Sequence, residues 1–178
     1  MSTLKLTEFR CLQETNQWQS SDSPYFIVFI GHFHGADPKS EVVVVRNESW
    51  DGKVDAKENF TVNMKVADNI TTSTFVLVAL LEEDDGPDFN SGEERLTKLR
   101  ESMKKFFKEF GTNVPILEPI AKEILDKFKQ DLKKYRYNDD RVDVQRLDIT
   151  TNTGRLPILT FNGGEEEGGV YRVRFEMV

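Results

Sequence analysis

Cysteine is nearly absent from the chain, because among 178 residues only Cys11 carries a thiol. One cysteine cannot form an internal disulfide, so the sequence predicts a protein of a reducing compartment. Long hydrophobic runs are also missing: the first residues hold no apolar stretch of signal-peptide length, and no run approaches the roughly 18 apolar residues of a membrane span. We therefore expect a soluble, cytoplasmic protein, with non-classical export left open.

Positive charge is in deficit. The 24 lysines and arginines are outnumbered by 31 aspartates and glutamates, which gives a formal net charge of −7. Nucleic acids bind to basic surfaces, so we expect no nucleic-acid partner. The same charge argues against unaided binding to an anionic bilayer, although bound cations reverse the local sign. A protein or a membrane surface remains open as the partner, and the sequence does not specify an oligomeric state.

Catalytic signatures are missing as well. The chain contains no G-x-S-x-G, P-loop, G-x-G-x-x-G or H-E-x-x-H motif, and we predict no enzymatic activity. Cys11 has no base near it in the sequence, so we expect a buried core thiol. The only two histidines, His32 and His34, form an H-x-H pair that could begin a zinc site with Asp37. A surface position where a strand meets a turn is the alternative that we favour.

Strand patterns occupy both ends of the chain. Between residues 3 and 85, five segments either alternate apolar and polar residues or are continuously β-branched and aromatic, with polar linkers between them. The first segment shows a slip in its alternation near Phe9, and the longest apolar run, 74–84, predicts the central strand. Three further strand segments follow residue 140. The pattern predicts one mainly β domain over 1–178, an antiparallel sandwich or barrel of about eight strands.

The middle of the chain, about 92–137, changes to a helical period. Two apolar stripes joined by 111–115 predict an antiparallel helical hairpin inserted between the fifth and sixth strands, and Ser91 with Glu94 fits a capping box at its start. The stripes consist of Leu96, Leu99, Met103, Phe106, Phe107 and Phe110, then Ile120, Ile124, Phe128, Leu132 and Tyr135. They either pack on a sheet, which we favour, or swing out to bind a partner or a membrane.

Three segments in the first half of the chain carry a family resemblance. The stretch NQWQSSDSPYFIVFIG places Asp22, Pro24 and Tyr25 in a pattern close to D-x-x-G-x-S-D-P-Y-V-x-V, with Ser23 inserted. The next stretch has matching residues at Asn47, Trp50, Phe60 and Val62. The third, FVLVALLEEDDGPDFN, is an apolar strand that runs into an acidic cluster. In this order, the segments resemble a C2 domain over residues 3–90, which implies a C2-like β-sandwich that serves as a binding module.

The resemblance also implies a calcium site at the loop tip. Ca²⁺ takes about six to eight oxygen ligands, many of them carboxylates. In the C2-like arrangement Asp22 fits the second acidic ligand of the first loop, and the neutral Asn16 stands where the first is expected. The acidic cluster offers Glu82 with Asp84, or Glu83 with Asp85, and then Asp88 or Asn90. The candidate metal ligands are Asn16, Asp22, Glu82, Asp84, Asp85 and Asp88. The alternative is a solvated acidic turn that ends an aggregation-prone strand.

Trp18 lies beside the first-loop candidates in the sequence. An exposed tryptophan there would insert at a membrane interface or contact a partner, whereas a packed one would cover the edge of the sandwich. The leading hypothesis is a non-enzymatic, C2-like binding module that uses Ca²⁺ to recognise a membrane or protein partner through its loop tip. The second hypothesis is a structural, interaction or toxin-like component that acts through the helical hairpin without metal.

Overall fold

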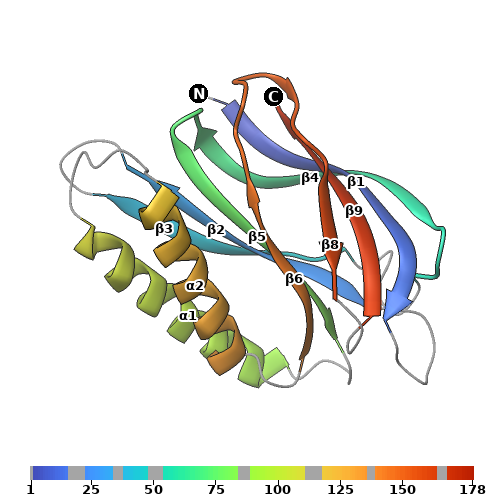
Figure 1. The fold of residues 1–178 in the computed structure, drawn as a ribbon, viewed down its shortest axis with the longest axis horizontal. Coiled ribbons are helices and arrows are strands. Elements are labelled where there is room, and N and C mark those ends of the chain that lie inside the picture. The colour runs from blue at the N-terminus through green and yellow to red at the C-terminus, as the bar shows by residue number, and fades with distance from the viewer. Residues whose placement is uncertain are drawn as a thin grey trace.

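The computed structural model describes residues 2–15, 23–33, 38–47, 54–83, 89–110, 118–135, 139–163 and 168–178. In this part of the chain, nine strands form two antiparallel sheets that pack face to face, and two helices follow the fifth strand (Figure 1). The strands are β1 (Ser2–Thr15), β2 (Pro24–His32), β3 (Lys39–Val45), β4 (Asn59–Ile70), β5 (Thr74–Glu83), β6 (Asp139–Leu147), β7 (Gly154–Arg155), β8 (Leu159–Asn162) and β9 (Gly168–Met177). The helices are α1 (Phe89–Glu109) and α2 (Glu118–Tyr135). The predicted mainly β sandwich with an inserted helical hairpin is confirmed.

The two sheets divide the strands by position rather than by sequence order. The five-stranded sheet has the order β4-β1-β9-β7, and β8 pairs with the same edge of β9. The four-stranded sheet has the order β3-β2-β5-β6. β5 thus lies between β2 and β6, as predicted from its long apolar run. The strand count is nine rather than about eight because the segment around Pro157 forms two short strands, and proline cannot donate to the ladder between them.

The slip in the first segment is a β-bulge. The register of β1 shifts between Leu6 and Glu8 against both of its neighbours. One extra residue in the strand returns the alternation to the same face, so Leu6 and Phe9 are both completely buried. Glu8 and Arg10 consequently point away from the core, on the outer face of the five-stranded sheet.

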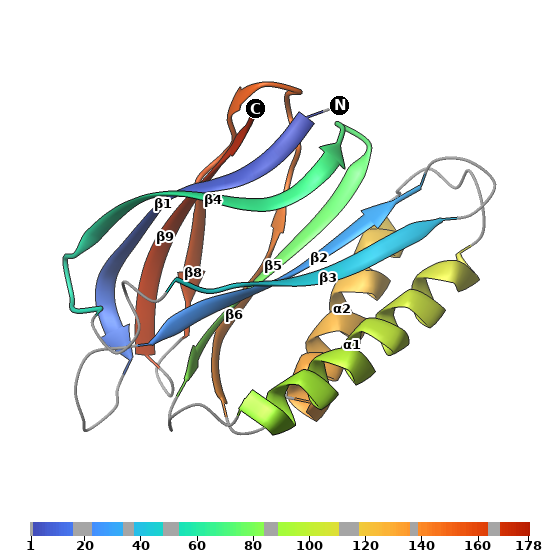
Figure 2. The same ribbon diagram turned by 180° about the vertical axis from the view of Figure 1, so that it is seen from behind.

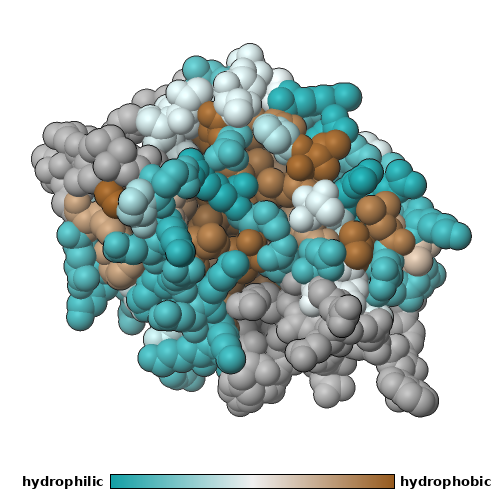
Figure 3. Space-filling model, viewed as in Figure 1, coloured by the Kyte–Doolittle hydropathy of each residue, from teal (hydrophilic) through white to brown (hydrophobic). Residues whose placement is uncertain are grey.

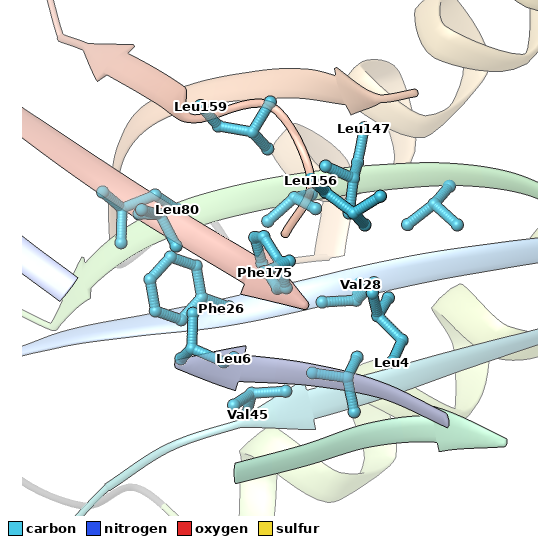
Figure 4. Close-up of a cluster of buried hydrophobic side chains, with 14 of the residues drawn as sticks. Leu4, Leu6, Phe26, Val28, Val45, Leu80, Leu147, Leu156, Leu159 and Phe175 are labelled. Carbon is cyan, nitrogen blue, oxygen red and sulfur yellow. The ribbon is translucent and has the colours of Figure 1, made fainter. Parts of the chain in front are cut away.

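Two hydrophobic cores explain why β2 and β5 are continuously apolar. Phe26 and Val28 of β2 belong to the core between the sheets, where Figure 4 shows them near Leu6 and Phe175 of the other sheet. The alternate residues Ile27 and Phe29 belong to a second core, between the four-stranded sheet and the helices. A strand that is buried on both faces reads as an unbroken apolar run.

The helical hairpin covers the outer face of the four-stranded sheet (Figure 2). The centres of both predicted stripes are buried there, among them Leu99, Met103 and Phe107 of α1. Lys127 of α2 also links the two helices, because its Nζ donates a hydrogen bond of 2.9 Å to Ser102 Oγ of α1. The same Nζ donates to Asp131 Oδ1, within α2, at 2.5 Å. The stripes are therefore packed on the sheet, as the favoured interpretation had it.

The start of α1 differs from the prediction. The helix begins at Phe89, so Ser91 lies within its first turn. A residue with helical neighbours before it cannot serve as the N-cap, and the predicted capping box with Glu94 is wrong. Glu94 instead pairs with Lys98 one turn later, with 2.6 Å between Oε1 and Nζ.

Candidate functional site

The strand ends that flank the two predicted metal-binding loops lie at the same end of the sandwich. Pro24, which starts β2, is opposite Glu82, near the end of β5. Thr15, which ends β1, is opposite Gly168 at the start of β9, and Figures 1 and 2 both place these ends together. The segments 16–22 and 84–88 are therefore attached to neighbouring points of one end, which we call the Glu82 end.

Only one of the predicted site residues belongs to the described part of the chain. Glu82 lies within β5, whereas the other predicted ligands and the predicted partner-binding tryptophan lie outside the described residues. These are Asn16, Trp18, Asp22, Asp84, Asp85 and Asp88. The proposed ligand set thus stays a prediction. Of the alternative zinc site, His34 and Asp37 also lie outside, and His32 is half-buried at the end of β2.

Glu82 holds two strand ends together. The residue is 2% exposed, and its Oε1 accepts a hydrogen bond of 3.1 Å from the backbone N–H of Ser23. A buried carboxylate needs such a donor, because an unpaired charge in the interior is costly. The contact connects the last residue before β2 with the end of β5, and so anchors the segment that follows residue 22.

Acidic residues occupy paired register positions on β5 and β6 at the same end. In the strand register Glu82 is opposite Asp140, and Glu83 is opposite Asp139. Like charges directly opposite each other destabilise a strand pair. Among the side chains that the structure describes, no three of the histidine, cysteine, aspartate and glutamate type lie close enough to hold a metal ion. Cys11 is completely buried in the core between the sheets, as expected for a structural thiol.

A groove of about 520 Å³ lies between the first turns of α2 and β6. Its apolar lining comes from Leu77, Pro119, Ala121 and Leu125. Figure 3 shows apolar atoms gathered in the middle of this face, beside the polar surface of the helices. Glu118 and Arg146 close one side through an ion pair of 3.0 Å, and Lys122 also lines the groove. Its volume lies in the roughly 300–1,000 Å³ range of small-molecule pockets, but nothing in the groove selects one occupant.

A second hollow, which sequence analysis missed, lies on the outer face of the five-stranded sheet. It has a volume of about 150 Å³, and Arg10, Arg172 and Arg174 contribute to its lining together with Glu8, Ile158 and Val173. The alternation of Arg172 and Arg174 with apolar residues is visible in the sequence, but this pattern predicts only a strand. The negative net charge gave no sign that arginines from two distant strands would meet.

No protein-family model matches the chain, and comparison with curated proteins found none of significant similarity in sequence. Neither of the helices in the described ranges is both long enough and apolar enough to cross a membrane.

Proposed function

We propose that the protein is a non-enzymatic, C2-like binding module that recognises a protein or membrane partner through the Glu82 end, with Ca²⁺ as the bridging cation. The observation that carries the proposal is the strand register, which attaches the segments 16–22 and 84–88 to one end of the sandwich. Both segments contain carboxylates that the resemblance to C2 domains marks as ligands. The sandwich architecture is compatible with that resemblance.

The residues of the Glu82 end provide the charge and the support that a cation requires. In the strand register Glu82 and Glu83 are opposite Asp140 and Asp139, so four acidic positions belong to the paired ends of β5 and β6. A bound cation offsets the repulsion between such carboxylates. Glu82 also fixes the start of β2 through Ser23, which reduces the ordering that binding would require. Ca²⁺ would supply the positive charge through which an anionic partner binds.

The packing of the hairpin supports this function over the alternative of a toxin-like or interaction component. Its central apolar residues, Leu99, Met103, Phe107, Ile124 and Phe128, are already buried against the sheet. Releasing them would expose both the hairpin and the strand face beneath it, at a cost of roughly 25 cal/mol for each Å² of apolar surface. A module that uses its loop end needs no such rearrangement.

Titration with Ca²⁺, followed by calorimetry and thermal unfolding, tests the proposal. We expect saturable heat and a higher Tm in the wild type, and loss of both in the double variant Asp22→Asn/Asp84→Asn. The matched control is Asp126→Asn, which removes one carboxylate from an exposed site on α2 and should leave the response unchanged. Absence of any heat or Tm change at millimolar Ca²⁺ would overturn the calcium proposal, as would an equal response in all three proteins.

A further inference from the structure

The outer face of the five-stranded sheet brings arginines of two strands together. In the pairing of β1 with β9, Arg10 is directly opposite Arg172, and Glu8 is directly opposite Arg174. The intervening residues, among them Phe9 and Val173, are buried in the core. Since successive side chains of a strand point to opposite faces, Glu8 and the three arginines lie together on the outer face. Arg10 and Arg172 are thus cross-strand neighbours of like charge.

The side chains of these arginines have few partners among the described residues. Within that part of the chain, neither the Arg10 nor the Arg172 side chain forms a hydrogen bond or an ion pair, and both residues are exposed. Arg174 is the most enclosed, with 24% of its side chain exposed. Its Nε lies 3.2 Å from Glu8 Oε2, yet the N–H does not point at that oxygen, and this buried donor has no hydrogen-bond acceptor in the described part of the chain. The ion pair is therefore an electrostatic contact that leaves donors available.

The three side chains line one small hollow. Its volume of about 150 Å³ is well below the roughly 300–1,000 Å³ of pockets for drug-sized ligands, so it suits a compact group. Ile158 lines the hollow and is 48% exposed. It lies between Leu156, which donates its N–H to Phe175 O, and Leu159, which pairs with Val173. Three residues there span two of β9, and they form the connection between β7 and β8 rather than regular strand.

The described lining of the hollow carries more positive than negative charge. Among the described lining residues Glu8 is the only acidic one, against Arg10, Arg172 and Arg174, which leaves an excess of two positive charges. Further along the same face Glu176 is already paired with Arg155, at 3.1 Å between Oε1 and Nε. Like charges placed directly opposite each other destabilise a sheet. A ligand of opposite charge would remove that cost, even though the chain as a whole has a net charge of −7.

We propose that Arg10, Arg172 and Arg174 form a binding site for a phosphate group. A phosphate monoester dianion matches both the excess charge and the size of the hollow, and guanidinium groups bind phosphate oxygens through paired N–H donors. Ile158 would contact the apolar part next to the phosphate. The same chemistry is presented by a soluble phosphate ester and by the headgroup of phosphatidic acid. The site is separate from the Glu82 end and needs no Ca²⁺.

Calorimetry with glycerol 3-phosphate, in EDTA and at constant ionic strength, tests the site in solution. We expect saturable binding, weakened about tenfold or more in the double variant Arg10→Gln/Arg172→Gln, because two charge-assisted contacts are lost. Arg155→Gln is the matched control, since it removes one exposed arginine from the same sheet and should bind as the wild type does. Arg172→Lys keeps the positive charge but loses the paired N–H donors of the guanidinium group, so its affinity should be intermediate. Circular dichroism verifies that each variant is folded.

Sedimentation with vesicles of phosphatidylcholine, with or without phosphatidic acid, distinguishes the source of the phosphate. Binding to glycerol 3-phosphate assigns a soluble ester, and binding only to phosphatidic acid vesicles assigns a lipid headgroup; both support the site. Phosphatidylserine vesicles of equal charge should bind less. The proposal is overturned if no probe binds, or if Arg10→Gln/Arg172→Gln and Arg155→Gln bind alike. Because EDTA is present throughout, these outcomes are independent of the calcium proposal.

Discussion

Glu41 on β3 and Glu94 on α1 are single carboxylates whose surroundings act in opposite directions. Although Glu41 is exposed as a residue, partial desolvation and then the negative charge of Asp68 raise the pKa of its carboxyl. The hydrogen bond from Lys98, followed by the positive charge of the same residue, lowers the pKa of Glu94. A raised carboxyl pKa means that ionisation opposes folding, and a lowered one means that ionisation favours it.

The two carboxylates therefore predict opposite pH dependences. Above the raised pKa of Glu41 its charge destabilises the folded state, so Glu41→Gln should increase Tm at pH 7, and the increase should shrink as the pH falls through that pKa. Glu94→Gln should slightly decrease Tm at pH 7, and this loss should disappear as the pH falls through the lowered pKa of Glu94. Thermal unfolding of the wild type and of each variant between about pH 3 and 8, which covers the usual titration range of carboxyl groups, measures both Tm differences. Tm differences of the same sign would contradict the assigned causes.

At the level of elements, the close packing of α1 against β2 depends on a glycine, which has no side chain. Gly31 lies on the helix-facing side of β2, and a Cβ placed there would come within 2.6 Å of two ring carbons of Phe107. Phe107 also packs edge-on against Phe29, with 5.6 Å between the ring centroids. The aromatic ring thus lies directly on the strand backbone, which sets how closely the helix approaches the sheet.

Gly31→Ala should consequently destabilise the protein by about 1–3 kcal/mol, the usual cost of overpacking a core. Phe107→Leu combined with Gly31→Ala should cost less than the sum of the two changes, because the smaller side chain makes room for the methyl group. Gly154→Ala is the control: its site is open, and its strain comes from a φ of +91°, so Phe107→Leu should not relieve it. Urea unfolding measures the free energy of unfolding of the three single variants and of the two double variants with Phe107→Leu. If the effects of Gly31→Ala and Phe107→Leu simply add, the contact between Gly31 and Phe107 is refuted.

The elements also show which features follow from sequence and which do not. The continuous run of β2 predicted a buried strand, and the slip at Phe9 predicted an irregular β1, because both are local patterns. The cluster of Arg10 and Arg172 was not predictable in the same way, since it exists only where β1 and β9 pair across the length of the chain. The Glu82–Ser23 hydrogen bond depends on the register of β2 and β5, which alternation alone does not specify.

On the scale of the whole molecule, the pairing of β1 with β9 joins the two ends of the chain. It extends from Leu4 opposite Met177 to Thr15 opposite Gly168, and Thr3 and Val178 exchange two backbone hydrogen bonds of 2.7 and 3.0 Å. Pairing of segments so distant in sequence requires the closure of a long loop. Non-local pairing of this kind slows folding, because the entropy of closure is lost before the contacts form.

A circular permutant tests this view of the fold. Joining Val178 to Ser2 through a short glycine–serine linker, and opening the chain within 111–117, makes β9 and β1 neighbours in sequence. The closure cost should then fall by about 2–3 kcal/mol, so refolding followed by stopped-flow fluorescence should be at least severalfold faster. The control permutant has the same linker but is opened within 164–167, which separates β8 from β9 and exchanges one local pairing for another. Its rate should change less. If the first permutant folds no faster than the wild type, pairing of β1 with β9 does not limit the folding rate.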